Sequence, residues 1–427
     1  MAESKSPSPT KSGSGIVRAF TSKNYRVFWY GHFSFILGVW INRMAVGWIT
    51  WQLTASATWL GIIGAAAMVP LIFFGPLAGA AADRYGHRRQ LVIATFIGAC
   101  ITGTIAALHV SGLLTPEILL VLATGGGITR SFTVPARNAM LPSLVDKEDL
   151  PAAIGVNGAS YHGGRFVGPA IGGVVLANWG PGEALFLVTA ISIFTGLLLL
   201  ALQIDDRGVA RNSKKRLLGD LVDGFTYTFQ HKAMRSVMLM VTVSAFFLEP
   251  YMEMLPAFAD LVLQSGETGL ALLMTATGSG AMIGGLWLAQ RGRMEGLVRI
   301  QLTGLVLGAI SLAVFANSLT PIVSLISLFV TGFGVVIAMI STNSLVQNTV
   351  DNTYRARVMS LNAVLISGGP ALGALVIGRA ADSFGLSPPV SVSVALGLLV
   401  WIFGVQTVWK YRGELEQSGL SQDNKHT

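Results

Sequence analysis

Apolar runs of about twenty residues recur along almost the whole chain, and they constrain its fold more than any other feature of the sequence. Each run has the length that an α-helix needs to cross about 30 Å of hydrocarbon. The expected spans cover about residues 26–53, 58–82, 90–110, 117–137, 152–177, 183–203, 236–263, 268–289, 298–316, 320–345, 355–380 and 388–411. The sequence therefore predicts an all-α integral membrane protein with about twelve transmembrane helices.

The composition and the placement of charge support this prediction. Of 427 residues, 52% are hydrophobic and 12% are charged, whereas a soluble protein carries about 25% charged residues. The formal net charge of +8 could suggest nucleic acid, but most of the 29 Lys and Arg residues lie in the two tails or in alternate loops between spans. That asymmetry keeps loops in the cytoplasm. We therefore expect a lipid bilayer around the protein, both termini in the cytoplasm and no nucleic-acid partner.

The sequence offers little chemistry for an enzyme. Its one cysteine, Cys100, lies in an apolar run, so the chain can form neither an internal disulfide nor a thiolate metal cluster. It has no GxxxxGK[ST] loop for a nucleotide and no nucleophile with a matching base. We expect a non-enzymatic protein without a metal site or cofactor, in which a proton gradient is the energy source.

The two halves of the chain resemble each other. An offset of about 205 residues pairs Asn138 with Asn343 and Asn157 with Asn362. This indicates a duplicated six-helix unit, the layout in which two bundles rock about a central site. The predicted domains are a disordered cytoplasmic tail (1–24), an N-terminal six-helix bundle (25–203), a cytoplasmic linker (204–235), a C-terminal six-helix bundle (236–412) and a second cytoplasmic tail (413–427).

Several ionisable residues fall inside the predicted spans. A charge at the centre of the bilayer costs about 2.5–3.5 kcal/mol, so such residues usually face a wet cavity or a partner charge. Arg137, near a span end, is interpreted as a surface residue. The candidates for a substrate or proton pathway are Arg43, Arg130, His162, Arg165, Glu249 and Glu253.

Glu249 and Glu253 are four residues apart, so both are expected on one helix face, with Pro250 between them opening the backbone. Two carboxylates so close in a low dielectric resist simultaneous ionisation, so at least one is expected to hold a proton. We hypothesise that they carry the transported proton, while the arginines hold an anionic or hydrogen-bond-accepting substrate or act as counter-ions. A static ion-pair network that joins the halves is an equal alternative.

A short charged turn follows the second span in GPLAGAAADRYGHRRQL, residues 75–91, and suggests a gate. Acidic and basic residues beside other span ends could meet it across the cytoplasmic seam when the cavity faces out. Simple positive-inside topology would explain the cations but not the acids. Asp149 before Pro151 also predicts a helix cap. The predicted cytoplasmic gate comprises Gly79, Asp83, Arg84, Gly86, Arg88, Asp146, Asp149, Arg291, Arg293, Arg355 and Arg357.

The fifth span is rich in glycine. Missing side chains let a neighbouring backbone approach closely, and proline kinks the helix by removing a hydrogen bond. Ordinary helix packing would explain the glycines alone. The predicted helix-packing motif consists of Gly164, Gly168, Pro169, Gly172 and Gly173.

The charged turn, the opening YRVFWYGHFSFILGVWINRMAVGWITWQLTASATWLG and the segments VPARNAMLPSLV and LPAFADLVL resemble the major facilitator superfamily. The similarity is greatest to the branch of the enterobactin exporter and the macrolide efflux proteins. It implies two pseudo-symmetric six-helix bundles, and a fifth-helix glycine motif that packs against the other half and opposes leakage. Branch members often have an aspartate where this chain has Val39, which shifts the expected proton site to the two glutamates.

The resemblance implies a secondary active transporter that exports a small amphiphilic molecule, drug-like or siderophore-like, across the bacterial inner membrane. Proton antiport with alternating access is the expected mechanism, and the expected protein is a monomer with protons and a small molecule as its partners. The alternatives are a proton-coupled importer of an organic anion and a membrane sensor or scaffold that transports nothing. The sequence does not identify the substrate.

Overall fold

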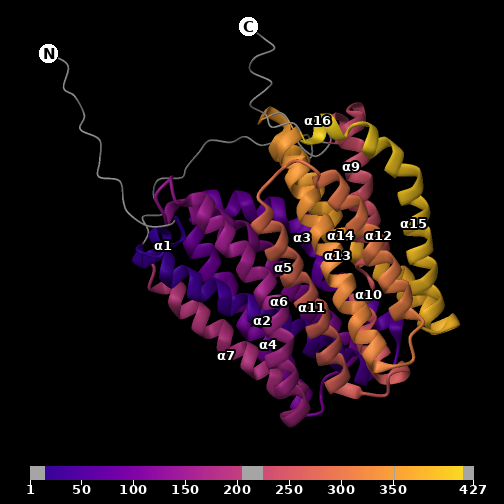
Figure 1. The fold of residues 1–427 in the computed structure, drawn as a ribbon. Coiled ribbons are helices and arrows are strands. Elements are labelled where there is room, and N and C mark those ends of the chain that lie inside the picture. The colour runs from indigo at the N-terminus through magenta and orange to yellow at the C-terminus, as the bar shows by residue number, and fades with distance from the viewer. Residues whose placement is uncertain (1–14, 204–224, 351, 417–427) are drawn as a thin grey trace, which may run out of the picture.

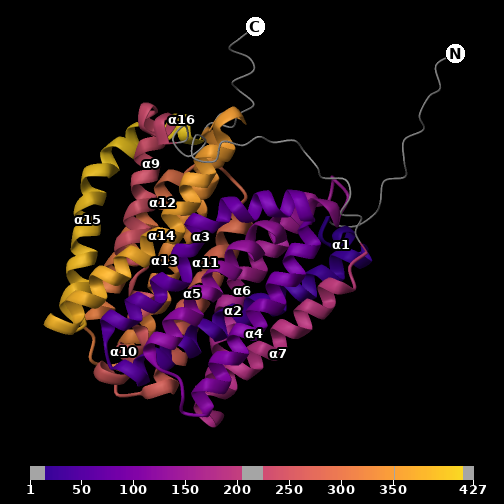
Figure 2. The same cartoon turned by 180° about the vertical axis from the view of Figure 1, so that it is seen from behind.

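The computed structural model describes residues 15–203, 225–350 and 352–416, and in these ranges all regular structure is helical. Figures 1 and 2 show two helical bundles packed side by side, formed by the first and second halves of the chain. The first bundle contains α1 (Gly15–Ala19), α2 (Lys23–Thr54), α3 (Ala57–Tyr85), α4 (His87–Val110), α5 (Pro116–Met140), the short helix η1 (Leu141–Ser143), α6 (Leu150–Trp179) and α7 (Pro181–Leu200).

The second bundle begins with one long, irregular pass and continues with regular helices. That first pass consists of α9 (Lys232–Thr242), the π-helical η3 (Val243–Leu248), α10 (Tyr251–Ala257) and the π-helical η4 (Phe258–Val262). The remaining helices are α11 (Gly266–Arg291), α12 (Leu297–Ala316), α13 (Pro321–Thr349), α14 (Asn352–Phe384), α15 (Ser387–Lys410) and α16 (Arg412–Glu416).

Within the described ranges, 11 helices are long and apolar enough to cross a membrane. The 30-residue α6 is not among them, because its glycines, His162 and Arg165 lower its hydropathy. Its length nevertheless matches a membrane pass, and it packs between α2 and α11. The described structure is thus consistent with the predicted all-α membrane fold of twelve helices in two bundles.

The two ends of the bundles are named by their landmarks. The face with α1 and α16 is called the terminal face (Figure 1). The opposite end, called the far face, carries the α2–α3 turn at residues 55–56 and the α14–α15 turn at residues 385–386. Glu416 accepts hydrogen bonds from the backbone N–H groups of Gly296 and Val298, so α16 caps the start of α12 on the terminal face.

The structure corrects the predicted tails and linker where it describes them. Residues 15–24 are not a disordered tail, because α1 and the first turn of α2 lie there and Arg18 forms a 2.8 Å ion pair with Asp149. Residues 225–230 are helical and α9 already begins at Lys232, inside the predicted linker. α16 occupies part of the predicted second tail. The rest of these segments, 1–14, 204–224 and 417–427, lies outside the described residues.

Two antiparallel helix pairs join the bundles, α3 with α14 and α6 with α11. Close backbone approach in the far half depends on glycine. A Cβ at Gly61 in α3 would lie 2.5 Å from the carbonyl oxygen of Ala374 in α14, and one at Gly278 in α11 would overlap the backbone of Arg165 in α6. These positions tolerate no side chain, so the two bundles are tightly sealed there.

The bundles diverge toward the terminal face. Along the α3–α14 pair, Gly368 still contacts Ile72 about halfway down, but a Cβ at Gly79 in α3 would have no atom within 4 Å. The same holds for Gly155 and Gly158 near the start of α6. Among the described residues, the interface is therefore closed in its far half and open in its terminal half, where a groove lies between α6 and α11.

Candidate functional site

Two adjoining cavities lie at the middle of the molecule. One of about 210 Å³ lies mainly inside the first bundle, and one of about 160 Å³ lies between the bundles. They share the lining residues Trp40, Arg43, Ala67, Met68, Arg130 and Tyr161. Because the same side chains border both spaces, the two cavities form one candidate site, called here the central cavity.

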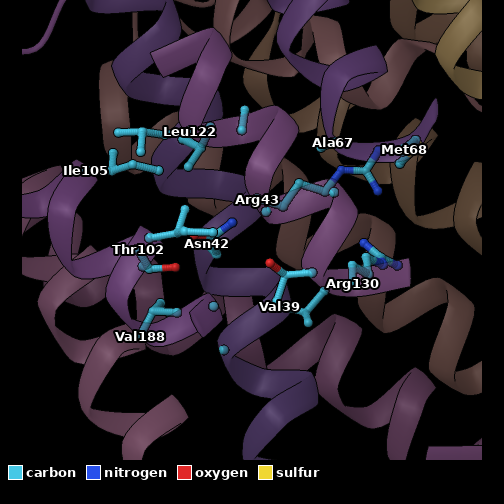
Figure 3. Close-up of a pocket in the computed structure, with 18 of the residues that line it drawn as sticks. Val39, Asn42, Arg43, Ala67, Met68, Thr102, Ile105, Leu122, Arg130 and Val188 are labelled. Carbon is cyan, nitrogen blue, oxygen red and sulfur yellow. The ribbon is translucent and has the colours of Figure 1, made fainter. Parts of the chain in front are cut away.

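The larger cavity has an apolar end and a cationic end. Figure 3 shows Ile105, Leu122 and Val188 on one side of the space and Arg43 and Arg130 on the other. Ligand sites are usually lined by apolar side chains with a few polar groups that fix orientation. The lining therefore suits a molecule with an apolar body and one polar or charged end.

Arg43 and Glu253 connect the bundles at this cavity. Nη2 of Arg43 in α2 lies 2.6 Å from Oε1 of Glu253 in α10, in a charge-assisted hydrogen bond. Both side chains are largely buried, with 23% and 13% of their surface exposed. Both residues are among those predicted for the substrate or proton pathway, but nothing in the sequence indicates that they pair with each other.

Trp40 organises the arginines of the first bundle. The guanidinium carbon of Arg43 lies 5.6 Å from the Trp40 ring centroid, and that of Arg165 lies 5.3 Å from it. Such distances are within the range of cation–π attraction. Arg165 also donates to the thioether of Met252 in α10, 3.2 Å away. Trp40 thus holds two cations on the boundary between the bundles.

Arg130 in α5 borders both cavities. Within the described residues, its guanidinium group has no ion pair or hydrogen bond, although its cost in a membrane is high. An unpaired cation beside an apolar cavity is suited to an anionic or hydrogen-bond-accepting ligand.

The two glutamates occupy different parts of the central cavity. Glu253 borders the larger cavity and Glu249 borders the cavity between the bundles. The helix is not regular between them, because η3 is π-helical and Pro250 precedes α10. The expected break of the backbone at Pro250 is present. That both carboxylates share one helix face stays a prediction.

His162 lies away from the central cavity. It faces Gly285 of α11 across a separate groove of about 430 Å³ between α6 and α11 near the terminal face. Side chains three positions apart on an α-helix point about 60° away from each other around the helix axis. Arg165 therefore lies at the central cavity, whereas His162 lies at the groove.

Arg137 is not a surface residue, contrary to our interpretation of the sequence. Only 5% of it is exposed, and its guanidinium carbon lies 3.8 Å from the Phe35 ring centroid. Within the described parts of the chain, all three guanidinium nitrogens lack a hydrogen-bond partner, as do both ring nitrogens of His32 and Oδ1 of Asn157. The first bundle therefore buries a polar cluster that sequence analysis did not assemble, because His32 and Asn157 come from different helices.

The glycine motif of α6 serves mainly the first bundle. A Cβ at Gly164, Gly168 or Gly172 would collide with side chains of α2 in the same bundle. At Gly173 it would collide with Ala271 of α11, in the other bundle. The family resemblance implied that this motif packs against the other half of the protein. Within the motif, Gly173 makes that contact. Pro169 is buried inside the helix.

Comparison with known proteins identifies the family. Residues 15–420 match the family described as transmembrane secretion effector. The chain belongs to this family. By its family and its fold, the protein is a membrane transporter of the major facilitator type, as the sequence predicted.

Relatives of this chain include transporters from several bacteria. The chain is 26% identical over 371 residues to the staphyloferrin A transporter of Staphylococcus aureus, covering 86% of this chain and 92% of the relative. It is 26% identical over 357 residues to the multidrug efflux pump Tap of Mycobacterium tuberculosis, covering 81% and 84%. Identity to macrolide efflux protein A of Streptococcus pyogenes is 21% over 370 residues, covering 85% and 90%.

Solved structures of other transporters share the fold of this chain. The nucleoside transporter NupG superposes with a TM-score of 0.69 at 17% identity, covering 90% of this chain and 98% of NupG. A bacterial homologue of the lysosomal transporter Spinster superposes with a TM-score of 0.67 at 15% identity, covering 94% and 97%. These similarities establish the architecture.

The contacts of the predicted gate residues Asp83, Arg88 and Asp149 that follow lie within the first bundle. Asp83 Oδ1 lies 3.7 Å from His87 Nε2, and Arg88 donates to the backbone oxygens of Leu199 and Leu200. Asp149 precedes α6 as predicted, but its side chain makes no capping hydrogen bond and pairs with Arg18 instead.

The remaining gate residues lie around the same face. Gly86 has a φ of 92° and separates α3 from α4, while Arg84 stacks on Tyr85. Arg291 donates to backbone oxygens of Arg293 and Glu295 in the turn after α11, and Arg293 borders the α6–α11 groove. Arg355 is exposed, Arg357 stacks on Tyr354, and the backbone oxygen of Asp146 accepts from the Asp149 N–H. In this open terminal half, the predicted meeting of charges across the seam stays a prediction.

Polar contacts between the two bundles lie at the far face of the protein. These contacts were not predicted from the sequence. Indole N–H groups of Trp48 and Trp51 donate to Glu267 and Asp260, each at 2.8 Å. Asp382 of α14 contacts the start of α3. In each contact, the second bundle supplies a carboxylate and the first supplies a neutral donor. The sequence signal was an acid beside a predicted span end, which alone does not distinguish a contact from a solvated charge.

Proposed function

We propose that this protein exports a small amphiphilic molecule, drug-like or siderophore-like, across the bacterial inner membrane in exchange for protons. The Arg43–Glu253 ion pair carries the proposal, because it joins two movable bundles at a largely apolar cavity. The names of the relatives, an efflux pump for several drugs, a macrolide efflux protein and a siderophore transporter, support it.

The proposed orientation places the terminal face in the cytoplasm, as the distribution of Lys and Arg favours. Because the far half of the interface is closed and the terminal half is open, cargo enters from the cytoplasm in the conformation described. Rocking of the bundles then opens the far half, which is the general scheme for duplicated six-helix transporters.

Glu253 is the proposed proton carrier. When its carboxylate is ionised it pairs with Arg43, and breaking a buried pair is costly if one charge remains. A proton taken up at Glu253 from the far side removes that charge, frees Arg43 and weakens the link between the bundles. Glu249, in the cavity between the bundles, is the second proposed carboxylate of the pathway. No cofactor takes part.

Transport assays in proteoliposomes test this function. We would load ethidium as the probe, impose a pH gradient and follow ethidium flux together with counter-flux of protons. Wild type should couple the two, Glu253→Gln should uncouple them, and Glu295→Gln, which alters an exposed carboxylate, should behave as wild type. Unchanged gradient-driven flux in both Glu249→Gln and Glu253→Gln would eliminate the proton role.

Import of an organic anion is the second candidate function. The observation that favours it is the unpaired Arg130 at the cavity, close to the cationic Arg43. The same liposomes with carboxyfluorescein as the probe separate the two functions. Accumulation of this anion in the direction of the proton gradient, lost in Arg130→Gln, would support import and contradict antiport.

A further inference from the structure

Two segments at opposite ends of the molecule have almost the same sequence. Residues 79–86 read GAAADRYG and residues 378–385 read GRAADSFG. The glycines, the second and third alanines and the aspartate match, and an aromatic residue precedes the last glycine in both. Each final glycine has a positive φ, 92° at Gly86 and 79° at Gly385, and follows the end of a long helix.

The two copies end the helices that pair across the bundle interface. The first copy ends α3 and the second ends α14. Because α3 and α14 run antiparallel, the first copy lies on the terminal face and the second on the far face. The second copy therefore lies at the opposite end of the molecule from the charged turn that we assign to the gate, and its helix runs in the opposite direction.

The second copy is in contact with the other bundle. Asp382 Oδ1 accepts from the backbone N–H of Ala57 at 2.7 Å, and Oδ2 accepts from the Ser56 hydroxyl at 2.6 Å and the Thr58 N–H at 3.1 Å. Gly378, one turn earlier, lies so close to the Ala57 backbone that a Cβ there would collide with it. Glycine thus permits the approach that brings the carboxylate to α3.

These bonds complete the cap of α3. The first four N–H groups of a helix have no partner within it. Asp382 accepts from the N–H groups of Ala57 and Thr58, Thr54 Oγ1 accepts from that of Ser56, and the Ser56 hydroxyl accepts from that of Trp59. An acidic group is also favoured at this end by the helix dipole. Half of the cap of α3 is therefore supplied by the opposite bundle.

Among the residues that the structure describes, the first copy makes no equivalent contact in this conformation. A Cβ at Gly79 would have no atom within 4 Å. The Asp83 side chain is 44% exposed and lies 3.7 Å from His87 of its own bundle. The engaged copy marks the closed half of the interface, and the other copy lies in the open half.

We propose that Asp382 is a positioning residue of the transport cycle, whose carboxylate caps α3 while the far face is closed and releases it when the far face opens. Water can replace the lost hydrogen bonds once the far face is wet, so the net cost of release is modest. That suits a contact made and broken in every cycle. The inference rests on the alternating-access part of the proposed function, and needs neither a particular cargo nor proton coupling.

Distance measurements between spin labels test the proposal on the full chain in nanodiscs. Cys100→Ser removes the native thiol, and labels at Leu113→Cys and Leu319→Cys report the far face, since these side chains are 64% and 80% exposed. We expect Asp382→Ala to raise the ratio of far-open to far-closed molecules about 2- to 30-fold, the range expected for loss of a helix cap. Asp382→Asn, which keeps one acceptor oxygen, should restore most of the closed population.

Two further variants make the result decisive. Gly378→Ala, which separates the same backbones without altering the carboxylate, should shift the ratio in the same direction, and it serves if Asp382→Ala does not fold. Asp83→Ala, in the unengaged copy, should not raise the far-open fraction. An unchanged ratio in both Asp382→Ala and Gly378→Ala would overturn this inference. A wild type without any far-open population would instead contradict the alternating access of the proposed function.

Discussion

The carboxylate of Glu253 lies directly against the backbone of Gly64. A Cβ at this position of α3 would be 2.9 Å from the carboxyl carbon of Glu253. On the other side, the same carboxylate pairs with Arg43 of α2 at 2.6 Å. Three helices from two bundles therefore meet at one charged group, and the missing side chain of α3 is what leaves room for it.

Gly64→Ala should impair transport by displacing Glu253. The added methyl group pushes the carboxylate from Arg43, and overpacking of this kind costs about 1–3 kcal/mol. We expect a several-fold loss of coupled flux in liposomes and a lower unfolding temperature. Gly413→Ala is the control, because it adds the same methyl group at an exposed helical position where a Cβ has no atom within 4 Å. Equal activity of the two variants would contradict this account of the site.

The Arg43–Glu253 pair should show strong coupling in a double-mutant cycle. Arg43→Gln or Glu253→Gln alone leaves one charge largely buried, which costs about 3–5 kcal/mol in comparable pairs. The double variant removes both charges, so its loss of stability should be smaller than the sum of the single losses. Thermal unfolding in detergent measures the loss of stability of each single variant and of the double variant. Additive losses would show that the two side chains do not stabilise each other.

Arg137→Met should leave stability unchanged or raise it. The guanidinium group is buried, and none of its nitrogens has a hydrogen-bond partner among the residues that the structure describes. Replacing a buried charge with an apolar side chain of similar length removes its desolvation cost, and Met can still pack on Phe35. The test is the unfolding temperature, with Arg137→Lys, which keeps the charge, as control. A marked loss of stability in Arg137→Met would show that the cation has a favourable partner.

Gly164→Val and Gly173→Val should fail in different ways. At Gly164 the new side chain collides with Ile36 inside the first bundle, so we expect lower stability. At Gly173 it collides with Ala271 of the other bundle, so we expect a population shifted toward the far-open state with stability less affected. Unfolding temperatures and far-face spin-label distances distinguish the two. The same effect from both substitutions would contradict the separate roles of these glycines.

The sequence predicted the fold well because membrane insertion is a local property. Each apolar run near twenty residues must form a helix, since a backbone in hydrocarbon has to satisfy its own hydrogen bonds. Even α6, whose hydropathy is lowered by glycines and Arg165, was predicted as a span at about 152–177 from the length of its mostly apolar run. The errors lie at the ends of the predicted domains, where α1 and α16 pack on the bundles through Arg18 and Glu416.

The candidate site was predicted only as a set of residues. Arg43, Arg130, Arg165, Glu249 and Glu253 all border the central cavity, as their cost in a membrane suggested. His162 does not, because its direction depends on how α6 is rotated against α11. The contacts of Asp382 join residues more than 300 positions apart, and no pattern within one helix encodes them.

The sequence by itself determined that this chain forms about twelve membrane helices with costly charges inside them, because length and hydropathy act within each segment. Only the tertiary structure decided which charges meet: Glu253 with Arg43, Asp382 with the start of α3, and Arg137 with an aromatic ring. The reason is geometric, since each pairing depends on the rotation of its helices and on where glycine allows two backbones to touch.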